Sequence, residues 1–144
     1  MHILYTTPAF PPFHGGGERY VHSLALTLAQ MGHRVTAVTS TAATIEAYWQ
    51  GQNATPQTLE IAPGLTVIRN PITPFPGGRQ TLMLWRKLMA LISSLPGDQT
   101  AVLRPMARYF PRIKNLDALL NTHLQAVDVV HGFNTAWETP LLAA

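Results

Sequence analysis

The chain has 144 residues, a formal net charge of +3 and 47% hydrophobic residues, which together indicate one globular domain able to bury a core. It contains no cysteine, which excludes disulfide bonds and thiolate metal sites and is typical of a reducing cytoplasm. No uncharged apolar run approaches the ~18 residues that a transmembrane helix needs, and the apolar run that starts at His2 leaves no place for a signal peptide. We therefore expect a cytoplasmic protein.

The first 40 residues predict a βαβ unit. Residues 2–6 favour a strand that stops at Pro8, and residues 33–39 form a second run rich in β-branched side chains. Between them, apolar residues recur at the spacing of one helical face: Val21, Leu24, Ala25, Leu28 and Met31. We expect this helix to begin near Gly17 and to end at Gly32, which suits a left-handed cap. Such a crossover implies a parallel sheet flanked by helices.

Three consecutive glycines, residues 15–17, connect the first strand to this helix. Glycine tolerates positive φ and lets the main chain approach a ligand closely, and a helix N-terminus attracts anions. Because α/β folds bind ligands at the carboxyl ends of their strands, we interpret the loop as a site for a phosphate or carboxylate, with a plain turn as the alternative. The chain lacks both G-x-G-x-x-G behind the first strand and a Gly-Lys-Ser/Thr tripeptide, which argues against NAD and a nucleoside-triphosphate loop.

The rest of the chain continues the alternation of strands and helices. The predicted elements are a short helix at 44–50, strands at 59–61 and 65–69 about a turn at Pro63-Gly64, an irregular loop at 71–78, an apolar helix at 79–95, a helix at 113–123, a strand at 126–131 and a helix after 132–135. This order predicts a three-layer Rossmann-like α/β domain with a parallel sheet flanked by helices, spanning residues 1–144.

Residues 79–114 are locally basic. Asp98 is the only acid in a segment that carries seven cations: Arg79, Arg86, Lys87, Arg104, Arg108, Arg112 and Lys114. With its tryptophan and leucines, the segment suits an anionic membrane surface or a lipid-linked or phosphorylated acceptor. The alternative is a helix packed on the sheet with its cations in solvent. We expect no nucleic-acid partner, because the segment has no recognition-helix motif and no strand in which aromatic residues alternate with basic ones.

The six histidines form no metal-ligand pattern, since none is paired at i, i+4 beside a carboxylate and no H-E-x-x-H occurs; we therefore expect no metal. His131 ends the apolar run 127–130, which would place it at the same sheet edge as the glycine loop; the alternative is a buried histidine satisfied by the backbone. Asp128 should point to the opposite face, so the two form no dyad. Without a triad or a carboxylate pair, a self-contained hydrolase is disfavoured.

A longer pattern runs through the first 40 residues: Pro11-Pro12-x-x-Gly15-Gly16-x-Glu18, then Leu24-Ala25-x-x-Leu28, then Gly32-His33-x-Val35-Thr36-x-Val38-Thr39. A shorter second pattern is Asp128-Val129-Val130-His131. Both resemble the N-terminal domain of group 1 retaining glycosyltransferases, which have two facing Rossmann-like domains (GT-B type). The resemblance implies a transferase that moves a sugar from a nucleotide diphosphate sugar to an acceptor with retention and without a metal or other cofactor.

The resemblance also implies roles for individual residues. Gly15, Gly16 and Gly17 would bind the donor diphosphate, and His131 would act at the transferred sugar, because an imidazole both donates and accepts hydrogen bonds. The residues implied for the acceptor are His14, Glu18 and Asn134. Family members often have a polar residue or a histidine two positions after the histidine that corresponds to His131, where this chain has Phe133.

In enzymes of this family a second domain carries most of the nucleotide-sugar site, and residues 1–144 contain none of it. The expected partners are therefore a nucleotide-sugar donor, an acceptor and a missing C-terminal domain, and an isolated fragment would be inactive. The basic segment at 79–114 leaves open a peripheral location at the inner face of the membrane. The competing interpretation is a non-catalytic α/β module that binds an anionic small molecule or a partner on the glycine loop.

Overall fold

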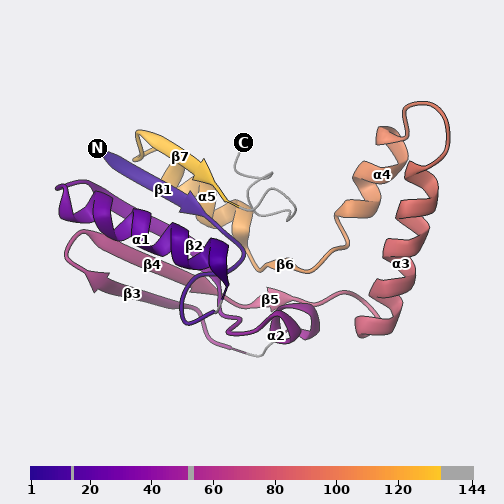
Figure 1. Cartoon of the computed structure of the whole chain (residues 1–144), viewed down its shortest axis with the longest axis horizontal. Helices are drawn as coiled ribbons and strands as arrows, with labels where there is room; N and C mark the ends of the chain where they lie inside the picture. The colour runs from indigo at the N-terminus through magenta and orange to yellow at the C-terminus, as the bar shows by residue number, and fades with distance from the viewer. Residues whose placement is uncertain (14, 52–53, 134–144) are drawn as a thin grey trace.

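The computed structural model of the chain describes residues 1–13, 15–51 and 54–133. Its strands are β1 (His2–Thr6), β2 (Arg34–Ser40), β3 (Gln57–Ala62), β4 (Leu65–Asn70), β5 (Ile72–Thr73), β6 (Arg112–Ile113) and β7 (Val129–Gly132). Its helices are α1 (Gly16–Gln30), α2 (Ile45–Gln50), α3 (Gly78–Ser93), α4 (Thr100–Ala107) and α5 (Leu116–Leu124) (Figure 1).

The main sheet has five strands in the order β3-β4-β2-β1-β7. Strand β1 pairs in parallel with β2 and β7, and β2 pairs in parallel with β4. Only the edge strand β3 is antiparallel, since it forms a hairpin with β4 through the predicted turn at Pro63-Gly64. The carboxyl ends of β1, β2, β4 and β7 therefore meet at one edge, where α/β folds keep their ligands.

The two faces of this sheet are covered by different helices, which gives the three predicted layers. On one face α1 packs its buried Val21, Ala25 and Ala29 against alternate strand residues such as Tyr5 and Val67. On the other face α5 packs against the residues of opposite parity; the cluster there comprises Leu4, Val38, Ile68, Ile113, Leu116 and Leu120. The alternation of inward side chains along each strand assigns the residues to these two cores. The structure confirms the α/β class and the Rossmann-like arrangement.

Helices α3 and α4 depart from the expected layers. The alternative of a helix packed on the sheet is wrong for α3, because α3 packs on α2 and α4 and stands away from the sheet (Figure 1). The chain leaves the domain through β5 and returns through β6, and these two short strands pair with each other, Ile72 opposite Ile113. Residues 74–111 thus form an arm on a two-stranded stem. Among the described residues, no helix is long and apolar enough to cross a membrane.

Most predicted elements are confirmed within a few residues. Helix α1 ends at Gln30, and Gly32, two residues later, has φ +86, as the predicted left-handed cap requires. Met31 does not face the core as its spacing suggested, because it lies beyond the last turn of α1 and is exposed. Strand β7 and helix α5 both begin three residues later than expected. The helix expected after residues 132–135 lies outside the described residues.

Candidate functional site

The glycine loop lies where the sequence places it, between β1 and the first turn of α1. Gly15 is the N-cap, with extended φ −163 and ψ 160 and no side-chain cap. Residues 15–17 do not use the positive φ that glycine tolerates, since the glycines with left-handed backbone lie elsewhere in the described chain. The backbone of the loop is therefore open to any L-residue, so backbone conformation does not explain the three glycines.

The three glycines of this loop differ in how much room their surroundings leave for a Cβ atom. A Cβ at Gly15 would collide with the carboxylate of Glu18, which folds back over the N-cap from the first turn of α1. A Cβ at Gly16 or at Gly17 would meet nothing within 4 Å. Glu18 thus places a negative charge at the positive end of α1, and the space beside Gly16 and Gly17 stays open to an approaching group.

His131 lies near the carboxyl end of β7, in register with Tyr5 of β1. Its ring is 5.1 Å from the ring of Tyr5 and 5.0 Å from that of Phe133, and Phe133 lies 5.8 Å from Tyr20 of α1. Strand parity puts Tyr5, His131 and Phe133 on the face covered by α1. The imidazole is exposed at the rim of this aromatic cluster, which excludes the alternative of a buried histidine.

A depression of about 310 Å³ joins these two parts of the edge. It is lined by Thr7 after β1, by Gly17, Glu18 and Val21 of α1, and by Phe133 after β7. The amide of Phe133 donates to the carbonyl of Thr6, which holds the end of β7 beside the end of β1 (2.9 Å). The structure therefore brings Gly17 and Glu18 to one hollow with Phe133, and Phe133 in turn contacts His131.

Burial acts on the phenol at the base of this cluster. Tyr5 is 1% exposed, and burial, with a smaller contribution from Tyr20, raises the pKa of the Tyr5 phenol above its ordinary value. Tyr5 therefore keeps its proton at neutral pH and is a neutral neighbour of His131 on the adjacent strand. Asp128 does not enter the cluster, because its carboxylate accepts a hydrogen bond from the His2 amide at 2.7 Å, as expected for a residue that forms no dyad with His131.

Arg69 supports the loop that carries the glycines, a role that the sequence analysis missed. It lies at the carboxyl end of β4, is 8% exposed, and its guanidinium donates to the carbonyls of Phe10 and Pro11. Burial lowers the pKa of Arg69. Phe10 is fully buried and meets the ring of His22 edge-on at 5.4 Å. An arginine directly after the apolar pair Val67-Ile68 in a predicted strand was the available signal, because buried cations require partners.

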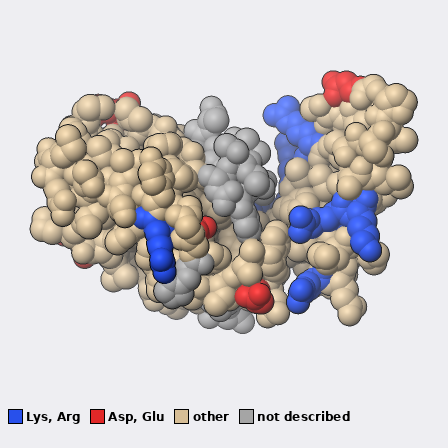
Figure 2. Space-filling view, viewed as in Figure 1, with Lys and Arg blue, Asp and Glu red and all other residues tan. Residues whose placement is uncertain are grey.

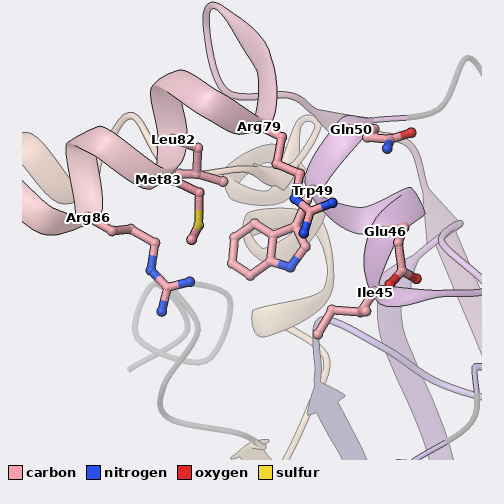
Figure 3. A pocket seen from close by; sticks show the side chains of 8 residues that line it. All are labelled: Ile45, Glu46, Trp49, Gln50, Arg79, Leu82, Met83 and Arg86. Atoms are coloured by element: carbon pink, nitrogen blue, oxygen red, sulfur yellow. The ribbon is translucent and has the colours of Figure 1, made fainter.

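A second hollow, of about 190 Å³, lies between α2 and α3. Figure 3 shows the indole of Trp49 at its centre, with Met83 and Arg86 reaching toward it from α3. The guanidinium of Arg86 lies 5.7 Å from the centre of the Trp49 ring, a cation–π geometry that fixes the arm against α2. This hollow is separate in its lining residues from the depression beside the glycine loop.

Two of the predicted acceptor residues, His14 and Asn134, lie outside the described residues. Of the predicted site, the described part therefore contains Gly17 and Glu18 in one hollow, Gly15 and Gly16 directly before them in the chain, and His131 in contact with Phe133 of the same hollow.

These features define the chain as a Rossmann-like α/β domain with a hollow at the carboxyl edge of its sheet, beside a glycine-bearing helix N-terminus. Glycosyltransferase Family 4 matches residues 14–102 of the chain. This range is more than half of the sequence, so the chain belongs to that family and is a glycosyltransferase-like domain of the GT-B N-terminal type. The match includes the glycine loop and most of the arm. No match is found among curated proteins.

Proposed function

We propose that this chain is the acceptor-side half of a retaining glycosyltransferase that uses a nucleotide diphosphate sugar. The observation that carries the proposal is the open space over Gly16 and Gly17 at the start of α1, where Gly17 lines a hollow shared with Phe133. Neither glycine is required by the backbone or by a neighbouring side chain, so close approach of a ligand is the use that remains.

The first helical amides would stabilise the charge that develops on the leaving diphosphate as the sugar bond breaks. Glu18 now lies over that helix end, so its carboxylate would swing away toward an acceptor hydroxyl when the diphosphate arrives. His131, whose ring lies between those of Tyr5 and Phe133 at about 5 Å from each, would hydrogen-bond a hydroxyl of the transferred sugar. The chain's role in the reaction would be electrostatic and positional, with no metal required.

The assignment is tested by titrating the isotope-labelled chain with inorganic pyrophosphate and with a nucleoside diphosphate, and following the backbone amides by NMR. We expect saturable shifts at Gly16, Gly17 and Phe133, with millimolar affinity because the facing domain is not present. Sulfate at equal ionic strength is the control for non-specific anion effects. Absence of saturable shifts at these amides would contradict the glycine-loop assignment.

The role of His131 is tested in the enzyme that joins this domain to its second half. His131→Ala should lower turnover about 100-fold or more, since the contact strengthens as charge develops, while the amide spectrum of the domain stays native. Turnover close to that of the parent enzyme would overturn the assignment. Tight diphosphate binding by the 144-residue chain, with no sugar transfer by the joined protein, would instead favour a non-catalytic anion-binding module.

A further inference from the structure

The arm at residues 74–111 is held together by one aromatic centre. The indole of Trp85 in α3 donates to the carbonyl of Met106 in α4 at 3.2 Å and packs on the rings of Tyr109 and Phe75, at 5.9 and 6.0 Å. Leu82, on the same side of α3, is 2% exposed. Helix α3 therefore packs on α4 through the face that carries Trp85, and its other faces take no part in this packing.

One of those other faces is a stripe of leucines. Leu84, Leu88, Leu91 and Leu95 follow at intervals of four, three and four residues, a spacing that puts them on one face of α3 and of the turn after it. They are 67%, 44%, 64% and 53% exposed. An ordered row of exposed leucines differs from the scattered apolar residues of any surface and indicates a contact surface.

A cation borders this stripe, and further cations lie elsewhere on the arm. Lys87 lies three residues after Leu84 and four before Leu91, so it is a neighbour of both on the helix surface. The exposed cations of the arm are Arg79, Arg86, Lys87, Arg104 and Arg108, and Arg112 and Lys114 follow at the stem. Figure 2 shows Lys and Arg side chains gathered over the part of the molecule that α3 and α4 form. The only acid in residues 79–114 is Asp98, in the connection between the two helices.

We propose that the arm lies on an anionic lipid bilayer, with the leucine stripe at the acyl boundary and Lys87 and other cations of the arm among the headgroups. Apolar side chains on one helical face beside Lys and Arg are what an interfacial helix needs. A second copy of the chain fits less well, because pairing two stripes would bring together two arms that each carry five cations and one acid, and like charges repel. This inference goes beyond the proposed function and does not depend on it.

The experiment is flotation of the full 144-residue chain with vesicles of equal parts phosphatidylcholine and phosphatidylglycerol, and with phosphatidylcholine alone. We expect binding to the anionic vesicles at low salt, at least about tenfold weaker binding to the neutral ones, and loss of most binding at ~0.5 M NaCl. Absence of binding to the anionic vesicles at low salt, or equal binding to both kinds, would overturn the proposal.

Two double charge-reversal variants distinguish the effect of the arm's cations on vesicle binding from the effect of the protein's net charge. Lys87→Glu with Arg104→Glu should weaken binding more than about tenfold, since each cation near an anionic surface contributes severalfold. Arg19→Glu with Arg34→Glu makes the same change in net charge at exposed cations of the sheet body and should bind nearly as well as the unaltered chain. Equal losses in the two pairs would contradict the proposal, because only net charge would then matter.

The leucine stripe is tested by Leu84→Ser, Leu88→Ser and Leu91→Ser together. We expect more than about tenfold weaker vesicle binding with an unchanged melting curve, because these side chains are exposed in the fold. Leu59→Ser with Ile61→Ser, on the exposed side chains of β3, is the matched control. If light scattering shows a dimer that the stripe variant converts to a monomer, and vesicle binding is unaffected, the stripe is a self-association surface and the proposal fails.

Discussion

Substitutions of single glycines in the loop can show whether each glycine serves the fold or ligand binding. Gly16 has an open position for a Cβ and lies at the first helical position of α1. Gly16→Ala should therefore raise the free energy of unfolding by about 0.5–1 kcal/mol, because alanine reduces the freedom of the unfolded chain. The same change should weaken pyrophosphate binding in the NMR titration. A loss of more than about 1 kcal/mol in denaturant unfolding would show instead that this glycine serves the fold.

Gly15→Ala is the companion variant. Its Cβ meets a flexible carboxylate rather than backbone, so Glu18 can turn away and the fold should persist. The effect on pyrophosphate is expected to be smaller than that of Gly16→Ala, since removing the carboxylate from the helix end also removes a competing negative charge.

At the scale of elements, the loop before α1 depends on β4 through Arg69. Arg69→Met should remove the guanidinium donors from the carbonyls of Phe10 and Pro11, at a local cost of about 1.5–3 kcal/mol for each bond to a charged group. The amide of Phe13, which donates to Phe10, is the reporter (3.2 Å). We expect its hydrogen exchange to become at least about tenfold faster, while amides of β2 keep their rates.

Arg69→Lys is the control, because it keeps the positive charge but loses the fork that reaches two carbonyls. It should give an intermediate exchange rate at Phe13. Equal exchange of Phe13 in the unaltered chain and the Met variant would show that Arg69 does not hold the loop.

The elements that the sequence predicted well are those whose signals are local. Strand β1, helix α1 and strand β2 each carry their own periodicity, and Gly32 marks the helix end by its φ preference. Helix α4 was missed because it contains Pro105, which lacks an amide hydrogen and normally argues against a helix interior. Strands β5 and β6 were missed because each has two residues and is defined only by pairing across the arm.

The position of α3 also could not be predicted from the sequence. Its composition indicates burial, yet Leu88 and Leu95 are exposed and only Leu82 is buried in that helix. Periodicity gives the face of a helix but not the element that it meets. The candidate site could be predicted only in part, because sequence patterns report local structure. The glycine loop carries a local motif, whereas the anchoring by Arg69 depends on contacts between residues about 60 positions apart in the chain.

At the scale of the whole molecule, the carboxyl and amino ends of the parallel strands form two edges of the sheet with different roles. The carboxyl edge carries the hollow, and the amino edge joins the start of the chain to β2 and to the segment before β7 through His2. One ring nitrogen of His2 donates to the carbonyl of Ala126 and the other contacts the hydroxyl of Thr36, both at 2.8 Å. Because a carbonyl only accepts, Nδ1 carries the proton. His2 thus ties three neighbouring segments of the sheet together at its buried end.

His123 of α5 makes this amino edge sensitive to acid. Burial in the first place, and then the nearby His2 and Arg34, lower the pKa of His123 below its ordinary value of 6.5. The unfolded chain therefore binds a proton more readily than the folded one, so the free energy of unfolding should fall as the pH drops below about 6.5. Urea unfolding at a series of pH values from 8 to 5 measures this slope.

His123→Gln should make the slope shallower, since it removes a group whose pKa differs between the folded and the unfolded chain. His33→Gln, at the turn after α1, controls for loss of a histidine elsewhere. Equal slopes for the unaltered chain and His123→Gln would show that the acid sensitivity of the domain arises from other groups.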